Sequence, residues 1–250
     1  MRDSEGKNAE KAKELSAVEN ISVVELDVTS EESVNSAVKQ IIDAEGKIDV
    51  VVNNAGIVNS GLTETVSIEQ SKEVFEVNTF GPLRVNRAVL PHMRKAKAGL
   101  IIQISSTVGR LVFPFIGAYI GSKFAVEALA ESYSMELAPL GIDSVIIEPG
   151  AYPTEIFSKM LMADDTARAE EYGEMAQAPT KMFEGMSKML SSDNAPNPQV
   201  VADAVKKLVD TPAGSRPIRT VADVMTGTIV EELNKAQDKA QAEMNKAMGM

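Results

Sequence analysis

The stretch ISVVELDVTSEESVNSAVKQIIDAEGKIDVVVNNAG at residues 21–56 decides the fold class. Short runs rich in β-branched residues stand at 21–28 and 48–56, and each of these runs predicts a strand. Between them, apolar side chains recur at the spacing of one helical face. These side chains are Val34, Val38, Ile41 and Ile42. The stretch therefore predicts a strand, a helix and a second strand.

The same alternation continues along the chain. We predict a helix over 67–96, a strand over 99–106, a helix over 117–138 and a strand over 142–150. Strands that are almost wholly apolar and alternate with amphipathic helices belong to a parallel sheet covered on both faces. The sequence therefore predicts an α/β fold with a doubly wound parallel sheet, formed as one domain over residues 1–250.

The composition excludes several classes of function. The chain has 36 acidic and 25 basic residues, and its formal net charge of -11 disfavours binding to nucleic acids and anionic membranes. It has no cysteine and one histidine, so it offers neither a thiolate nor a multi-histidine metal site. No apolar run approaches the roughly 18 to 20 residues that cross a bilayer, and the first residues lack a signal-peptide core. We expect a soluble, cytoplasmic protein without a metal.

Polar, small and glycine-containing segments follow the predicted strands. They are LDVT at 26–29, NNAG at 53–56, SSTVG at 105–109 and EPGAYPT at 148–154. Each alone is also typical of an ordinary turn. The carboxyl ends of parallel strands lie at one edge of a sheet, however, and ligands of doubly wound folds bind beyond that edge. We therefore expect these segments to converge on a binding site.

Tyr119 and Lys123 lie in the predicted helix that follows the third of these segments. Their spacing of four residues places both side chains on one helical face. Because basic residues make up one tenth of the chain, such a pair can arise by chance. The pair needs support from the rest of the sequence before a catalytic role is assigned to it.

That support comes from a resemblance to a family. The relevant motifs are NNAG at 53–56, Asn78 in VNTFG, Ser106 in ISSTVG, YIGSK at 119–123 and PGAYPT at 149–154. In order and interval they resemble the motifs of the short-chain dehydrogenase/reductases, from residue 1 to about 155 and more loosely beyond. The resemblance implies a Rossmann-type fold and hydride transfer between a nicotinamide cofactor and a carbonyl or secondary alcohol.

The resemblance also implies catalytic roles. Tyr119 would exchange a proton with the substrate oxygen, and the positive charges of Lys123 and of the oxidised nicotinamide would together lower the pKa of the phenol. Ser106 would polarise the substrate oxygen; its neighbour Ser105 competes for this role, and strand alternation lets only one of the two face the cleft. Asn78 would hold a water in a proton relay through Lys123, and the alternative is a solvated polar residue.

The residues expected to bind the cofactor are carried over in the same way. Lys123 and Tyr119 would contact the nicotinamide ribose, and Asp27 and Val28 would contact the adenine. The segment Asn54, Ala55 and Gly56 would pack beside the adenosine ribose, and the segment Pro149, Gly150 and Thr154 would line the nicotinamide.

Arg2 bears on the choice of cofactor. It resembles the arginine that binds the 2′-phosphate in family members that prefer NADP. The alternative is an exposed terminal arginine. We therefore expect NADP, with NAD possible.

The segment at about 155–195 occupies the place of the family's variable substrate lid, and a C-terminal extension follows at about 215–250. Six of the thirteen methionines fall within 160–190, where they form either ordinary helix packing or an adaptable apolar pocket. An apolar carbonyl or alcohol substrate is favoured. Helices at about 70–95 and 117–138 resemble those that pair family members, so a homodimer or homotetramer is expected.

The family's first strand, Gly-rich turn, first helix and second strand have no counterpart in the sequence, a difference of about 35 residues. Three explanations remain open: a misassigned start, a shortened protein without catalysis that acts as a binding or interaction partner, or strands supplied by another chain. The catalytic set favours the first. We expect the 250-residue chain alone to bind NADPH weakly or not at all, and an upstream-extended form to bind it.

Overall fold

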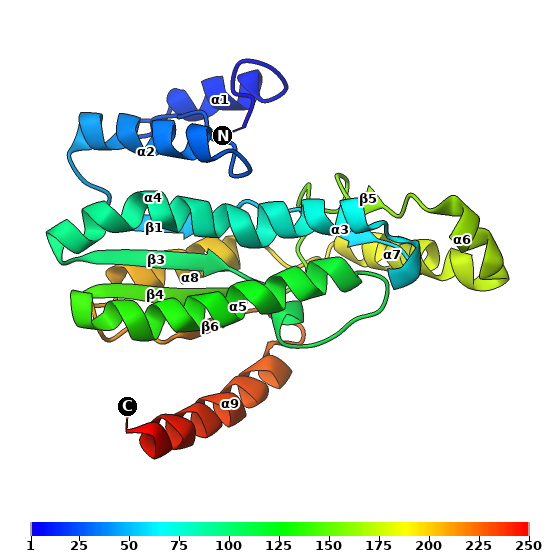
Figure 1. Ribbon diagram of the computed structural model, residues 1–250. Coiled ribbons are helices and arrows are strands. Elements are labelled where there is room, and N and C mark those ends of the chain that lie inside the picture. Colours follow the sequence, from blue (N-terminus) through cyan, green and yellow to red (C-terminus); the bar gives the residue numbers. More distant parts are fainter. Residues whose placement is uncertain (1, 250) are drawn as a thin grey trace.

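The computed structural model describes residues 2–249. Its main sheet has four parallel strands in the order β1-β3-β4-β6 (Figure 1). They are β1 (Val50–Asn53), β3 (Gly99–Ile104), β4 (Ile142–Pro149) and β6 (Arg219–Ala222). The register places Val50 opposite Leu100 and Gly99 opposite Ile142. The predicted α/β fold with a parallel sheet is confirmed.

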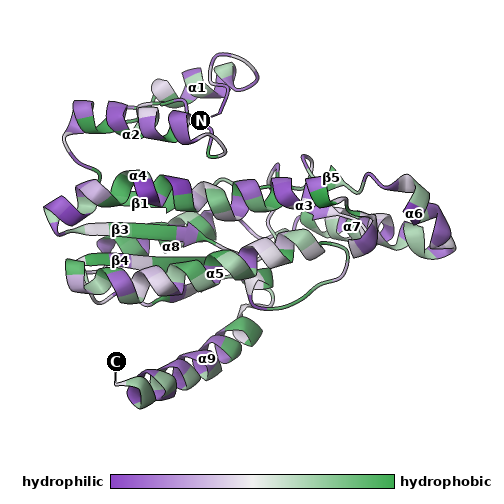
Figure 2. Ribbon diagram, in the orientation of Figure 1, coloured by the Kyte–Doolittle hydropathy of each residue, from purple (hydrophilic) through white to green (hydrophobic). Residues whose placement is uncertain are grey.

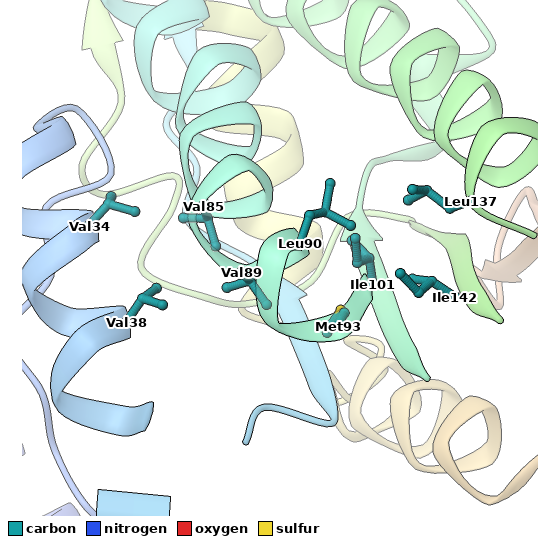
Figure 3. Packing of buried hydrophobic residues seen from close by; sticks show 9 residues of the cluster. All are labelled: Val34, Val38, Val85, Val89, Leu90, Met93, Ile101, Leu137 and Ile142. Atoms are coloured by element: carbon teal, nitrogen blue, oxygen red, sulfur yellow. The ribbon is translucent and has the colours of Figure 1, made fainter. Parts of the chain in front are cut away.

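Helices cover both faces of this sheet, because its strands are apolar on both sides. On one face pack α2 (Glu31–Glu45), α4 (Gly81–Ala96) and α5 (Gly117–Leu137), and on the other packs α8 (Gln199–Asp210). Ile101 points to the first face and its neighbours Leu100 and Ile102 point to the second. Figure 3 shows the first core. It consists of Val34, Val38, Val85, Val89, Leu90, Met93, Ile101, Leu137 and Ile142.

The remaining elements surround this framework. A second sheet pairs β2 (Asn59–Ser60) with β5 (Leu161–Met162). After it come α6 (Thr166–Glu171) and α7 (Ala178–Leu190), while α1 (Ala9–Ser16) and α9 (Gly227–Met248) lie near the two ends of the chain (Figure 1). Figure 2 shows that β3 and β4 are largely hydrophobic, whereas α2 and α9 alternate between hydrophilic and hydrophobic residues. Among residues 2–249, every helix is too short or too polar to span a bilayer.

The predicted helix over 67–96 contains a change of helix type. It begins at α3 (Ile68–Phe75), where the Ser67 hydroxyl accepts a hydrogen bond from the backbone N–H of Gln70 at 3.2 Å. A π-helical turn, η2 (Glu76–Phe80), joins α3 to α4. Single π turns inside helices often occur at functional sites, and this one carries Asn78.

The predicted strand over 21–28 is wrong. Residues 21–27 belong to neither sheet, because β1 pairs only with β3 and no strand of the described residues lies on its other side. A strand requires a hydrogen-bonded neighbour, which apolar composition alone does not supply. Leu26 and Val28 still pack against the core. Between this segment and β1 lies a groove of about 610 Å³.

Gly141 connects α5 to β4 in a conformation that requires glycine. Its φ is +75°, and a Cβ at this position would lie 2.4 Å from the backbone oxygen of Lys97. Gly214 has the same φ of +75°, but a Cβ there would meet nothing within 4 Å. An alanine at Gly214 would therefore introduce backbone strain alone, whereas an alanine at Gly141 would introduce both backbone strain and steric overlap.

We expect Gly214→Ala to lower the free energy of unfolding by about 1–2 kcal/mol, the cost of a left-handed non-glycine residue. Gly141→Ala should cost about 2 kcal/mol more, because the backbone at Lys97 must also shift. Urea denaturation of both variants measures the difference. Equal losses would contradict the close contact at Gly141.

Candidate active site

The predicted strand ends converge on one cavity of about 820 Å³. Asn54, Ser106 and Pro149, which stand at the carboxyl ends of β1, β3 and β4, all line it. The segment LDVT at 26–29 does not; Val28 instead lines the groove beside β1. Three of the four segments thus meet at the edge of the sheet where ligands of doubly wound folds bind.

Tyr119 and Lys123 enter this cavity from the first turns of α5. The backbone N–H of Tyr119 donates to Asn59 Oδ1 at 2.9 Å, which satisfies a free donor at the start of the helix. Lys123 is only 6% exposed, and its Nζ donates to the backbone oxygen of Ile104 at 2.8 Å. The same Nζ lies 5.7 Å from the centre of the Tyr119 ring.

The pKa of Tyr119 differs from the sequence-based expectation. We expected the charges of Lys123 and of an oxidised nicotinamide to lower it. Within the chain itself, burial of the phenol raises it, and the nearby Ser106 side chain only partly opposes that effect. Tyr119 is therefore protonated at neutral pH and is able to donate a proton. Burial lowers the pKa of Lys123 to about 8, against the opposing charge of Glu127.

Ser105 and Ser106 point in opposite directions, as strand alternation requires. Ser106 lines the cavity; its Oγ donates to the backbone oxygen of Pro149 at 3.4 Å and accepts from the N–H of Val108 at 3.3 Å. Ser105 is buried behind the cavity, next to Gly109. The structure thus places Ser106, and not Ser105, beside Tyr119.

Asn78 is 1% exposed, so the alternative of a solvated residue is wrong. Its Oδ1 accepts from the N–H of Ile57 at 2.9 Å, and its Nδ2 donates to the oxygen of Ile57 and to Ser122 Oγ, both at 2.9 Å. Ser122 Oγ in turn donates to the backbone oxygen of Tyr119 at 2.7 Å. Asn78 therefore ties the loop after β1 to the helix that carries Tyr119 and Lys123.

Besides Tyr119 and Lys123, five more of the residues expected at the cofactor line the same cavity: Asn54, Gly56, Pro149, Gly150 and Thr154. A Cβ at Gly56 would lie 3.4 Å from Asn78 Oδ1 and 3.9 Å from Lys123 Nζ. Glycine therefore keeps the backbone open directly in front of the lysine. The open backbone and the buried lysine behind it fit a nicotinamide nucleotide.

The other expected cofactor residues lie away from this cavity. Ala55 and Val28 line the groove beside β1, and the carbonyl of Val28 accepts a hydrogen bond from Arg84 Nη1 at 3.1 Å. Hydrogen bonds from Thr29 lower the pKa of Asp27, and the charge of Arg2 contributes to the same shift. Arg2 is exposed but lies close enough to act on Asp27.

Sequence reasoning identified the methionines of the lid as a group, and the structure shows which of them face the cavity: Met182, Met186 and Met189. Their helical spacing in the sequence was a usable signal. Asn59 was missed, because one polar residue in a loop carries no pattern. Val201 and Val205 of α8 also line the cavity.

No group of His, Cys, Asp or Glu in residues 2–249 has the arrangement of a metal site.

Comparisons with known proteins agree with this geometry. The sequence profile of the short chain dehydrogenases matches residues 1–164. The uncharacterized oxidoreductase YusZ of Bacillus subtilis is 37% identical over 210 residues, which cover 80% of this chain and 71% of YusZ. A 3-ketodihydrosphingosine reductase of Bacteroides thetaiotaomicron is 35% identical over 194 residues, with coverage of 76% and 70%.

Solved structures show the same fold. A short-chain dehydrogenase from Streptomyces avermitilis superimposes with a TM-score of 0.71 at 29% identity, over 92% of this chain and 80% of that one. ElxO with NADP bound gives a TM-score of 0.68 at 27% identity, over 87% and 83%. A Rossmann-type sheet with this cavity defines a nicotinamide-dependent oxidoreductase. The chain belongs to the short-chain dehydrogenase family, whose members act on CH–OH groups.

We expect Asn78→Ala to lower the free energy of unfolding by about 2–4 kcal/mol, because it removes three hydrogen bonds at a buried position. Asn35→Ala, at an exposed position of α2, should change it by no more than about 0.5 kcal/mol. Urea denaturation followed by circular dichroism compares the two variants. Similar losses for both would show that Asn78 does not connect the two segments.

Proposed function

We propose that the protein interconverts a carbonyl and a secondary alcohol with NADP(H), and that Tyr119 is the acid/base. The observation that carries this proposal is the meeting of Ser106, Tyr119 and Lys123 in one cavity, with the Ser106 side chain near enough to the phenol to act on its pKa. The oxidoreductase relatives support an enzyme over a binding protein without catalysis.

Each side chain has a defined part in carbonyl reduction. When bound, NADPH supplies a hydride to the carbonyl carbon. Tyr119 gives its proton to the carbonyl oxygen, and Ser106 Oγ donates a second hydrogen bond to that oxygen. The ammonium of Lys123 stabilises the phenolate that remains. Asn78 holds the loop and the helix in place for this transfer, and it is also suited to hold the relay water.

The choice of NADP rests on Arg2. Arg2 is near enough to Asp27 to lower the pKa of that carboxyl, so it stands at the end of the site expected to hold the adenosine. An arginine there can bind a 2′-phosphate through several donors. The similarity to ElxO, which has been solved with NADP bound, supports this choice.

The substrate is apolar away from its carbonyl. Beyond the catalytic residues, the cavity is walled by side chains of α7 and α8, among them Phe183, Met186 and Val205. Asp223 also lines it, but its carboxylate accepts hydrogen bonds from the backbone of Met225 and from Thr226. The similarity to a 3-ketodihydrosphingosine reductase is consistent with a ketone on an apolar body.

Self-association is part of the proposal. Phe80 in η2 and Phe124 in α5 are 46% and 40% exposed, although both belong to apolar residue types. They lie on the two helical regions that the sequence analysis expected at subunit contacts. Two exposed aromatic side chains are suited to burial against a second copy, and they support a homodimer or homotetramer.

Tyr119→Phe should reduce turnover of a carbonyl panel at saturating NADPH by at least about 100-fold, because it removes the proton donor. Cofactor affinity, measured by nucleotide fluorescence, should stay within about twofold, since the ring remains. Tyr133→Phe on the same helix serves as the control and should keep its activity. Full turnover by Tyr119→Phe would refute the proposed mechanism.

For straight-chain methyl ketones, we expect kcat/KM to rise about fourfold for each added methylene until the cavity is filled. Met186→Asp should flatten this dependence, because a carboxylate in the apolar wall disfavours the chain. The matched control is Met175→Asp, at a lid position that is 51% exposed and outside the cavity lining. If kcat/KM still rises with chain length in Met186→Asp, the substrate chain does not bind against this wall of the cavity.

A further inference from the structure

A buried ionic cluster lies behind the active site, centred on Arg219 of β6. The Arg219 side chain is only 4% exposed. It forms ion pairs with carboxylates from three other elements. These are Glu127 and Glu131 of α5, Glu148 of β4 and Asp238 of α9. The cluster therefore joins the helix that bears Tyr119 and Lys123 to the sheet and to the C-terminal helix.

The contacts around Glu148 account for part of this cluster. Arg219 Nε lies 3.6 Å and Arg110 Nε 3.8 Å from Glu148 Oε1, and Asn234 Nδ2 donates to Glu148 Oε2 at 2.6 Å. Burial raises the pKa of Glu148 to about 8, and the charge of Glu127 adds to that shift. Glu148 is thus held by Arg219, Arg110 and Asn234.

Glu127 connects the cluster to the active site. It lies one helical turn after Lys123, on the same face of α5, and both side chains are buried. Its Oε2 accepts a hydrogen bond from Arg219 Nε at 3.0 Å. Its Oε1 lies on the side of Gly109, in the segment that follows β3.

Gly109 packs against both Ser105 and Glu127. A Cβ at Gly109 would lie 2.6 Å from Ser105 Oγ and 3.3 Å from Glu127 Oε1. The hydroxyl of Ser105 is also close enough to lower the pKa of Glu127 against the effect of burial. Glu127 therefore packs against the segment that follows β3, while its helix carries Tyr119 and Lys123.

We propose that Glu127 is a positioning residue for the active site, which places a negative charge one helical turn from Lys123 and, through Arg219, ties α5 to β6. The proposal rests on the function proposed above for Lys123. Glu127 does not contact the substrate or the cofactor cavity. It acts through the lysine one turn away.

The electrostatics give the direction of the effect. Burial lowers the pKa of Lys123 to about 8, and the charge of Glu127 raises it. Tyr119 on α5 and the carbonyl of Ile104 on β3 also face Lys123. The charged groups around Glu127 itself are Arg219 of β6, Arg110 in the segment after β3, and Glu148 of β4. Loss of the Glu127 charge therefore lowers the pKa of Lys123, so the ammonium form is lost at a lower pH.

The test measures the titration of Lys123 directly. The chain is labelled with ¹³C at lysine Cε, and the Lys123 signal is assigned by its loss in Lys123→Met. In Glu127→Gln, the midpoint of the Lys123 titration should fall by about one pH unit, because Lys123 loses one nearby opposite charge. The matched control is Glu131→Gln, one turn further along α5, which also removes a partner of Arg219 and should leave the midpoint in place.

Turnover provides a second readout. The alkaline limb of kcat/KM for carbonyl reduction should move to lower pH in Glu127→Gln and stay in place in Glu131→Gln. If Glu127→Gln does not fold, Ser105→Ala replaces it, because loss of that hydroxyl favours the neutral form of Glu127 and should move the Lys123 midpoint in the same direction.

An unchanged Lys123 midpoint in the folded variant, or equal shifts in Glu127→Gln and Glu131→Gln, would overturn the proposal. Absence of turnover in the unmodified chain while NADPH is bound would instead count against the proposed function. The titration of Lys123 does not depend on turnover, so the two failures are distinguishable.

Discussion

The burial of the Lys123 ammonium is the constraint on which the rest of the site depends. A cation taken out of water loses solvation that only hydrogen bonds and opposite charges can replace. The structure supplies a backbone carbonyl from β3, at Ile104, and the field of Glu127 from the next helical turn. Because these partners do not fully compensate, the pKa of Lys123 falls to about 8, close to the pH at which proton transfer is useful.

That constraint fixes where α5 lies. The helix must place Lys123 against the end of β3 and also place Tyr119 beside Ser106, so it cannot slide along the sheet. Three sets of contacts hold it: Asn59 at its first turn, Asn78 through Ser122, and Arg219 through Glu127. The π turn that carries Asn78 belongs to the same arrangement, because a wider turn there directs a polar side chain into the interior.

Much of the fold could be predicted from local patterns. Between residues 48 and 150, the spacing of apolar residues indicates which face of each strand or helix is buried. The strands and helices predicted from that spacing are found in the structure. The segment 21–28 shows the limit of such patterns, because its composition suits a strand but pairing depends on a neighbour. For the candidate site, the motifs located Ser106, Tyr119 and Lys123 at one cavity. Asn59, Glu127 and Arg219 carry no motif and became visible only through their contacts.

The sequence by itself determined the class of protein, since the order and spacing of Asn78, Ser106, Tyr119 and Lys123 with an alternating α/β pattern point to one family. Only the tertiary structure decided the protonation of Tyr119, the direction of Ser105 and the partners of Lys123. The physical reason is that pKa values and hydrogen bonds depend on burial and on groups distant in sequence, such as Glu148 and Arg219 behind α5. The spacing of apolar residues indicates which face of a helix or strand is buried, but not which residues pack against that face.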